Sequence, residues 1–555
     1  MKPGRPARLG FALAGVAVLL AAVGLAPGRR PQSSGQIELQ LAVESLALDG
    51  DLAFAERDAE RFRREFGTSS LRGFRLQSGE ARPAQRTGQA GAGERPPGPA
   101  LRAPALWARA AAVARRSGGR AAVFALQWAW LFGGALLLAW AAKPRLGSSG
   151  APWVVGLAIL VTAAGFAPLY LVPETLLFFC MALATALVWG RRAGPDAEPE
   201  SIYAGELSER TGLWRWPLAG AAFGVVATGG APYLALAAPL LAAAPAGRRV
   251  GRVALFAGGA ALAFGGATLA GGWPWPPLEL ALQPQLLGWA AVGLAVGRHA
   301  GLLGWYAAAL VCVLAVARDQ GRRWIPWALA VAALAQVASA PFDLGGDSGA
   351  PGAPWFLPAL ALLAFAAAHA PGRGVALALG LLSIVLVAPG WCTALGLEGR
   401  AWARTAARVR ALLPLDTTLR EWPGAATLDR AGIVLTGFDP DVFVGGDGRL
   451  RLTGARAALL LESATPLDSI RLELGAAAPA DLALAGATAG DLVLRPDGEV
   501  GLDVLLGPPA RRHPTWRTPR GASIYSFAIE LPRRPAAPLA LDFSLARPAL
   551  AGESP

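Results

Sequence analysis

Cysteine and histidine are scarce in this sequence. Its 555 residues include three cysteines and three histidines. The cysteines are far apart and show no CxxC spacing, and the histidines are too few and too scattered for a recognisable metal cluster. Neither a zinc site nor a disulfide framework is therefore indicated, and we expect neither a metal nor another cofactor.

Charged residues are also few, at 16% of the chain, whereas hydrophobic residues make up 54%. A chain this apolar is not expected to form one soluble domain. The net charge is +13, but the basic residues fall in small groups between apolar runs instead of forming one stripe. We therefore expect a lipid bilayer as the environment of the chain and no nucleic acid as a partner.

The first apolar run, Leu9–Ala26, follows three basic residues and is about long enough to cross a bilayer. It predicts a retained N-terminal anchor within residues 1–30, and a cleavable signal peptide is the alternative. Residues 31–120 then form a long polar loop. Within this loop the amphipathic stretch Ile37–Phe66 is expected to be helical.

Further apolar runs predict a multi-span domain over residues 121–398. Leu286–Gly297 is interpreted as an interfacial helix, because counting it as a span would move a group of arginines to the outer face. With the anchor, the count reaches about eleven spans, and the arginine-rich short loops then all face the cytoplasm. The predicted spans are 121–142, 153–172, 175–190, 217–246 as two short or tilted helices, 253–271, 301–317, 325–340, 355–370 and 375–395.

From about Arg400 the pattern changes to alternating apolar and polar residues, interrupted by Asp-Gly pairs at Asp447 and Asp497. These are hairpin signals and predict an all-β, sandwich-like domain over residues 399–555. An odd number of spans after a cytoplasmic N-terminus places this domain outside the cytoplasm. The predicted fold class is thus an α-helical polytopic membrane protein with a C-terminal β domain, located in the inner membrane of a bacterium.

The segment Gln36–Leu52, QIELQLAVESLALDGDL, resembles the first periplasmic loop of the GT-C superfamily of integral-membrane glycosyltransferases. In that family an Asp-Glu pair opens an amphipathic helix that ends in a Gly-Asp turn, and Gly50 with Asp51 matches the turn. Gly35 and Gln36 stand where the pair would be, and Glu38 is the nearest carboxylate.

Later segments carry the same resemblance. Pro173 with Glu174 opens a span as in many of these transferases, and GRHAGLL at 297–303 and GGDSGAPGAPWF at 345–356 resemble segments of uncharacterised bacterial members. The second of these lacks the Arg that usually follows in the family. The resemblance implies transfer of a sugar from a polyprenyl-phosphate-linked donor to an envelope acceptor at the periplasmic face.

This chemistry needs a carboxylate to activate the acceptor and cations to hold the lipid phosphate. The candidate catalytic residues are Glu174, Glu38 and Asp51, and the candidate donor-phosphate ligands are Arg298 and His299. Each has a structural alternative. Glu174 would stabilise a helix start, Glu38 and Asp51 would form the polar face and stop of a helix, and Arg298 would extend to the membrane interface.

Two other classes of protein remain as alternatives. The first is a non-catalytic, membrane-anchored envelope scaffold or assembly protein whose β domain binds a partner or a glycan. The second is a transporter, which typically has charged residues within its spans and related halves, and neither feature is recognised here. Asp343 and Asp347 lie in a glycine-rich loop and are interpreted as turn residues.

Overall fold

The structure is a computed structural model. Leu9–Ala26, Arg298, His299, Asp343 and Asp347 lie outside the residues that the structure describes, as do the Asp-Gly pairs at 447–448 and 497–498. The described residues are 34–52, 55–66, 104–189, 213–242, 249–271, 284–297, 300–310, 312–313, 324–339, 352–366, 373–395, 405–406, 409–410, 412–413, 426–430, 433–437, 442–444, 449–463, 465–475, 478–479, 481–494, 499–507, 509, 511–513 and 522–545.

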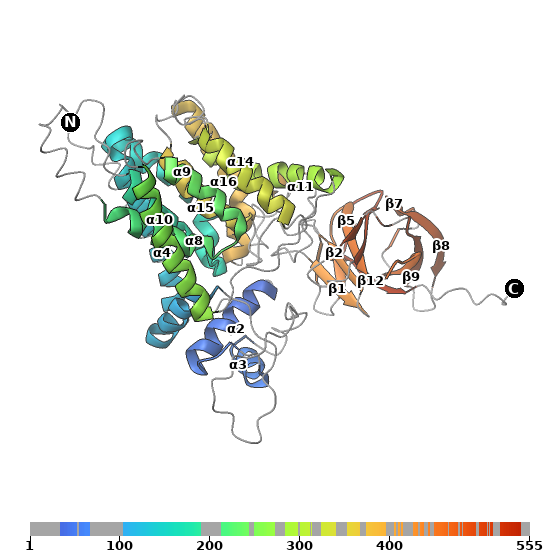
Figure 1. Ribbon diagram of the computed structural model, residues 1–555. Helices are drawn as coiled ribbons and strands as arrows, with labels where there is room; N and C mark the ends of the chain where they lie inside the picture. The colour runs from blue at the N-terminus through green and yellow to red at the C-terminus, as the bar shows by residue number, and fades with distance from the viewer. Residues whose placement is uncertain are drawn as a thin grey trace, which may run out of the picture. The chain divides into compact units, whose positions relative to one another are not determined.

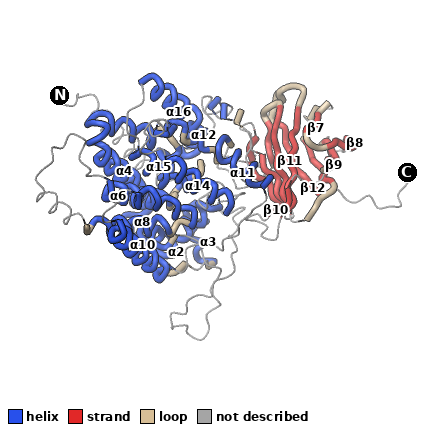
Figure 2. The backbone as a smooth tube through the Cα atoms, turned by 45° about the horizontal axis from the view of Figure 1, so that its top comes forward, coloured by secondary structure: helices blue, strands red, loops and turns tan. Residues whose placement is uncertain are grey.

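The chain consists of two compact units of different secondary structure. Residues Met1–Arg420 form a helical unit and residues Glu421–Pro555 form a β unit. Figure 2 shows this division by colour, with helices in blue and strands in red. The expectation of a mostly helical protein with a C-terminal β domain is confirmed, and the division lies later in the chain than the predicted boundary at 399.

The stretch predicted as one amphipathic helix is in fact two helices of different character. These are α2 (Ser34–Leu48) and α3 (Glu56–Phe66). Residues 36–45 of α2 are all buried, so the prediction of an amphipathic helix is wrong for α2. The reason is that α2 packs along α4 (Ala105–Leu160) and its polar side chains find partners there, as in the pair between Glu44 and Arg115 (2.7 Å). Helix α3 has buried and exposed faces, as predicted.

Two spans predicted at 121–142 and 153–172 are not separate, because α4 is one continuous helix. The chain breaks only after Leu160. Thr162 caps the short α5 (Ala163–Phe166) by accepting a hydrogen bond from the Ala164 backbone N–H, and the 3₁₀ helix η1 (Ala167–Tyr170) follows. The prediction was wrong because the glycine-rich segment around 147–150 looks like a loop in the sequence, whereas the helix continues through it.

Helix α6 (Glu174–Trp189) coincides with the predicted span 175–190. The run at 217–246 is divided as predicted, into α8 (Arg215–Ala227), the 3₁₀ helix η2 (Ala231–Leu236) and α9 (Ala237–Ala242). Helix α10 (Arg249–Gly271) packs closely along α8 (Figure 1).

One predicted span is not formed as a single helix. The span expected at 301–317 is wrong, because within the described residues the chain after α12 (Leu302–Trp305) turns into the 3₁₀ helix η4 (Ala307–Ala309) instead of continuing as one helix. The helix expected at 286–297 is present as α11 (Pro284–Val296), and its interfacial position stays a prediction. The remaining helical elements are α11 (Pro284–Val296), α12 (Leu302–Trp305), η4 (Ala307–Ala309), α14 (Trp324–Ser339), η5 (Pro354–Phe356), α15 (Leu357–Ala366) and α16 (Arg373–Leu395).

Among the described residues, two helical stretches are long and apolar enough to cross a membrane by length and composition. They are Ala105–Lys143 and Arg249–Leu269. Five further apolar helices are shorter: Glu174–Trp189, Ala231–Ala242, Trp327–Ser339, Pro354–Phe365 and Ala378–Cys392. The count of about eleven spans stays a prediction.

The β unit contains two six-stranded sheets, with strand orders β1-β2-β5-β11-β10, to which β7 is added at β11, and β3-β4-β12-β6-β9-β8. All the strand pairs are antiparallel, and inward-facing side chains of both sheets form one hydrophobic core. This is the packing of a β-sandwich. The strands are β1 (Ala426–Arg430), β2 (Ile433–Gly437), β3 (Val442–Val444), β4 (Leu450–Leu452), β5 (Arg456–Ser463), β6 (Ser469–Leu474), β7 (Ala483–Ala485), β8 (Thr488–Leu494), β9 (Val500–Leu505), β10 (Arg511–His513), β11 (Ala522–Glu530) and β12 (Leu539–Leu545).

Candidate functional site

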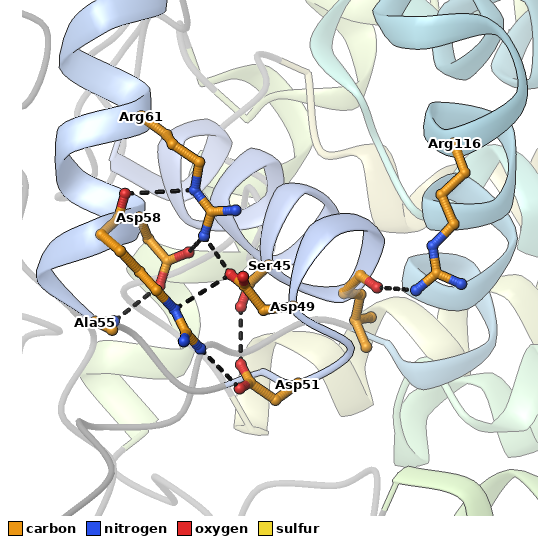
Figure 3. A network of polar contacts seen from close by, with 9 residues as sticks. Ser45, Asp49, Asp51, Ala55, Asp58, Arg61 and Arg116 are labelled. Atoms are coloured by element: carbon orange, nitrogen blue, oxygen red, sulfur yellow. Dashed lines mark hydrogen bonds and ion pairs between the residues drawn. The ribbon is translucent and has the colours of Figure 1, made fainter. Parts of the chain in front are cut away.

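The chain turns sharply at Asp51, one of the candidate catalytic residues. Its carboxylate accepts a hydrogen bond from the Ser45 hydroxyl (3.0 Å; Figure 3). It also pairs with Arg57 (3.1 Å). Gly50 has φ +80°, a left-handed conformation that favours glycine, and nothing lies within 4 Å of the place where its side chain would be. The Gly-Asp turn that the sequence predicts is therefore present, and these contacts give Asp51 a structural role.

Asp58 holds the same corner from the first turn of α3. Its carboxylate accepts a hydrogen bond from the Ala55 backbone N–H (2.8 Å) and pairs with Arg61 (2.5 Å), which also pairs with Asp49. Burial raises the pKa of the Asp58 carboxyl above its ordinary value, although the Ala55 amide and Arg61 act in the opposite direction. The corner is an ion-pair network that links α2 to α3.

Glu38 lies on the buried helix α2. The side chains of Gln36, Glu38 and Glu44 are buried along this helix, and the Gln36 amide donates a hydrogen bond to the backbone carbonyl of Tyr170 (3.3 Å). Buried polar side chains are costly unless they are hydrogen-bonded, so they fix the position of α2. The N-terminal end of α2 therefore contacts the segment that leads into α6.

Glu174 is the first residue of α6 and follows Pro173. Leu171, three residues earlier, has φ +53°. A left-handed conformation is uncommon for a residue that carries a side chain. An acidic residue at a helix start is favourable in any protein, but this helix start also depends on an unusual backbone conformation just before it.

A buried polar network fixes the turn beside Glu174. The Thr175 hydroxyl donates to the Val172 carbonyl (2.9 Å), and its oxygen accepts from the Gln127 side chain of α4. In the orientation that its neighbours require, the Gln127 amide donates to the Val172 carbonyl (3.0 Å) and accepts from the Trp107 indole N–H (2.6 Å). Since all these side chains are buried, the network holds the start of α6 against α4.

Two buried tyrosines lie near Glu174. Tyr233 comes from η2 and Tyr306 from the turn between α12 and η4, and both are buried within electrostatic range of the Glu174 carboxylate. The Tyr306 hydroxyl donates a hydrogen bond to the Ala353 carbonyl (3.4 Å). Four segments that are far apart in the sequence therefore meet at this place, which we call the Glu174 site: Glu174, Tyr233, Tyr306 and the Ala353 carbonyl.

The backbone is strained on two sides of the Glu174 site. Among the described residues, Leu171 and Ala353 are the two residues other than glycine that have positive φ, at +53° and +48°. Such conformations cost about 1–3 kcal/mol each and persist only where the surrounding structure holds them. They concentrate at functional sites, and here one precedes Glu174 and the other accepts the hydrogen bond of Tyr306.

The candidate residues from the sequence are thus distributed over different places. Asp51 lies in the α2–α3 corner, Glu38 lies on α2, and Glu174 lies in the Glu174 site, while Arg298 and His299 are outside the described residues. Sequence reasoning missed the two tyrosines. The available signal was their placement, since Tyr233 follows the Gly-Gly-Ala-Pro break at 229–232 and Tyr306 follows a tryptophan inside an apolar run.

Within the part of the chain that the structure describes, no group of three or more histidine, cysteine or acidic side chains is arranged to hold a metal ion. Comparison with known proteins adds no family. No family model matches the chain, and neither a curated protein nor a solved structure matches it. The residues of the Glu174 site and the sequence resemblance therefore remain as the guides to function.

Proposed function

We propose that the chain is a GT-C-like membrane glycosyltransferase of a bacterial inner membrane. It transfers a sugar from a polyprenyl-phosphate-linked donor to an envelope acceptor on the periplasmic side, with Glu174 as the carboxylate that takes the acceptor proton. The N-terminus is cytoplasmic and the β unit is extracytoplasmic in this proposal. The cations that hold the donor phosphate are Arg298 and His299.

One observation carries this proposal. A carboxylate at a helix start, two buried tyrosines and the two strained residues Leu171 and Ala353 come together at the Glu174 site. A helix cap needs only a side chain and a free backbone amide, so it does not account for this convergence. An ionisable residue within an apolar, membrane-type unit is a functional candidate because its burial is costly.

The surface of the helical unit supports a membrane location. Large apolar side chains are exposed on several of its helices, including Trp327 on α14, Leu262 on α10 and Trp140 on α4. A water-soluble unit rarely exposes so many, whereas in a bilayer the same side chains contact lipid. The Asp-Gly-Asp corner after α2 also agrees with the Gly-Asp turn of the family resemblance.

The proposal is tested by assaying Glu174→Gln in reconstituted membranes with polyprenyl-phosphate-linked hexoses. Removing a group that acts on charge in the transition state typically costs about a hundredfold or more in rate. We expect that loss for Glu174→Gln. Glu60→Gln is the matched control, because Glu60 is exposed on α3 and pairs only over one helical turn with Arg64 among its described contacts (3.4 Å).

A scaffold is the second candidate function, and Gly35 with Gln36 in place of the Asp-Glu pair favours it. In that case the wild-type protein transfers no sugar from any lipid-linked donor, and the β unit captures an envelope partner or glycan. Full activity of Glu174→Gln would contradict the assignment of the base and leave the glycosyltransferase proposal without its site.

A further inference from the structure

Helices α8 and α10 begin with sequences of similar character. Residues 214–217 are WRWP and residues 249–252 are RVGR, so each helix starts with arginine next to large apolar side chains. Neither helix has an acidic residue in its first turn. Positive charge is therefore concentrated at both helix starts, and no carboxylate of the same turns balances it.

The contacts between α8 and α10 show that these two starts lie at the same end. The Arg252 guanidinium lies over the Trp216 ring, 5.9 Å from the ring centre. One turn further along each helix, a Cβ atom on Gly220 would lie 2.0 Å from the Phe256 carbonyl oxygen. The step from 216 to 220 on α8 thus matches the step from 252 to 256 on α10, so the two helices are parallel.

Two arginines of α10 present their charges together at this end. Arg249 and Arg252 are three residues apart, so they lie on the same face of the helix. Arg249 is exposed and Arg252 is partly exposed. The Trp216 ring orients the Arg252 guanidinium without removing its charge, and the covered Nε atom has no hydrogen-bond acceptor among the described residues. Arg252 is therefore a fixed cation with its outer part open.

Exposed apolar side chains lie in the same first turns as these cations. Val250 on α10 is 84% exposed, Leu218 on α8 is 50% exposed, and Trp214, just before α8, is 53% exposed and lies under the Arg215 guanidinium (5.6 Å). A free anion or a nucleic acid backbone would contact only the cations. A molecule with an anionic head and apolar chains would contact both kinds of side chain. Charge and apolar exposure thus indicate the same partner, an anionic lipid.

We propose that the starts of α8 and α10 bind the phosphodiester headgroup of an anionic phospholipid. Arg249 and Arg252 contact the phosphate, and the acyl chains lie along the exposed apolar side chains of α10. Basic clusters between membrane helices are suited to anionic headgroups. The inference rests on the membrane location in the proposed function but not on sugar transfer. In the topology proposed there, this lipid belongs to the cytoplasmic leaflet, on the side opposite to the sugar donor.

The test measures lipid binding to the full-length protein in non-ionic detergent by native mass spectrometry, with phosphatidylglycerol and phosphatidylcholine as probes. Wild type should bind phosphatidylglycerol about tenfold more tightly than phosphatidylcholine. An arginine next to an anionic headgroup contributes about fivefold in affinity, so Arg249→Gln and Arg252→Gln should each weaken phosphatidylglycerol binding by about that factor. Arg252→Lys, which keeps the charge, should recover most of the loss.

Arg456→Gln is the matched control, because Arg456 is 69% exposed on β5 and pairs with Glu530 (3.2 Å). It removes the same charge from the β unit and should leave lipid binding unchanged. Arg249 is exposed, so Arg249→Gln tests the site even where Arg252→Gln fails to fold. An equal loss in Arg456→Gln would show that net charge alone attracts the lipid and would overturn the inference.

Three further outcomes are decisive. Equal binding of both lipids by wild type, or unchanged phosphatidylglycerol binding in Arg249→Gln, would overturn the inference. Displacement of phosphatidylglycerol by an equal concentration of inorganic phosphate would assign the site to a free anion and would also overturn it. Lipid discrimination that depends on these arginines in a protein that transfers no sugar would support the inference and overturn only the proposed activity.

Discussion

Helices α2 and α10 of the helical unit and strand β6 of the β unit place polar and apolar side chains in opposite ways. In the helical unit, the polar residues of α2 are buried, while Val250, Leu262 and Leu269 on α10 are 84%, 80% and 87% exposed. In the β unit, strand β6 alternates fully buried leucine and isoleucine with Arg471 and with other polar residues that face outward.

The difference is what the proposed membrane location of the helical unit would produce. Removing apolar surface from water lowers the free energy by about 25 cal/mol per Å², so a water-exposed unit buries its apolar side chains as β6 does. Lipid tails are as apolar as leucine, so a helix in a bilayer has no reason to bury leucine and gains instead by burying polar groups among partners. With the proposed membrane location, the exposed apolar side chains of α10 fit the second rule, and β6 follows the first.

The largest expected effect is the separation of the two units by solubility. Residues 421–555, expressed alone, should be soluble and monomeric in detergent-free buffer, with a circular dichroism spectrum dominated by strands. Residues 1–420 should aggregate under the same conditions and stay dispersed only in detergent or lipid. Size-exclusion chromatography with and without detergent measures both outcomes.

If the helical fragment were soluble in plain buffer, its exposed apolar side chains would face water, and the proposed difference in environment between the two units would be wrong. A helix-dominated spectrum of the 421–555 fragment would contradict the independent β-sandwich. Detergent is the internal control here, since it should change the behaviour of the first fragment and have little effect on the second.

The second-largest expected effect concerns the side chains that fill the interior of each unit. The β-unit core consists of large side chains from two sheets, whereas α8 and α10 approach each other closely through glycines. A Cβ atom on Gly259 would lie 2.0 Å from the Pro217 carbonyl oxygen, and one on Gly220 would lie 2.0 Å from the Phe256 carbonyl oxygen. Gly259→Ala should therefore destabilise the helical unit by about 1–3 kcal/mol, which thermal unfolding in lipid nanodiscs measures.

The neighbouring glycine provides the control. Nothing lies within 4 Å of a Cβ atom placed on Gly258. Gly258→Ala should be neutral or stabilise the protein by up to about 1 kcal/mol, because alanine is the better helix former. Equal effects of the two substitutions would show that α8 and α10 do not pack through Gly259 in the membrane.

Sequence patterns predicted the elements that have a clear local signal. The alternation in strands such as β6 and the Asp-Gly pairs at 447 and 497 predicted antiparallel hairpins, and the strands on either side of both pairs are indeed paired with each other. The break of the run 217–246 was also predicted, because Gly229, Gly230 and Pro232 interrupt a helix. In contrast, the continuity of α4 could not be predicted, since a helix in a packed unit tolerates glycines that read as a loop.

The candidate site was predictable only in part. Glu174 was identified because Pro173 precedes it at the start of an apolar run. Tyr233 and Tyr306 were not, because their positions depend on tertiary packing, which brings Tyr233 and Leu177 of α6 against the same glycine and packs α15 along α6. The burial of α2 was missed for the same reason, since a polar sequence on a helix looks amphipathic until its partners on α4 are known.

The smallest expected effect concerns two aspartates with opposite pH responses. In the β unit, Asp503 accepts two hydrogen bonds from Arg471 (2.7 and 2.8 Å), and these bonds lower the pKa of its carboxyl. A depressed folded-state pKa adds stability that is present above the unfolded value of about 3.9 and is lost as pH falls through the folded value. Since the pair is partly exposed, it contributes at most about 1 kcal/mol.

Asp58 in the helical unit has the opposite sign, because burial raises the pKa of its carboxyl above the unfolded value. Its ionised form costs stability as pH rises through the folded value, and acidification removes that cost. When pH is lowered from about 6 to about 3, the stability difference between wild type and Asp503→Asn should shrink, whereas that between wild type and Asp58→Asn should move in favour of wild type. Thermal unfolding at a series of pH values measures both differences. If the two stability differences changed in the same direction with pH, Asp58 would not be buried among its partners in the folded protein. The contrast between a buried polar corner and a water-facing ion pair would then not hold for these two carboxylates.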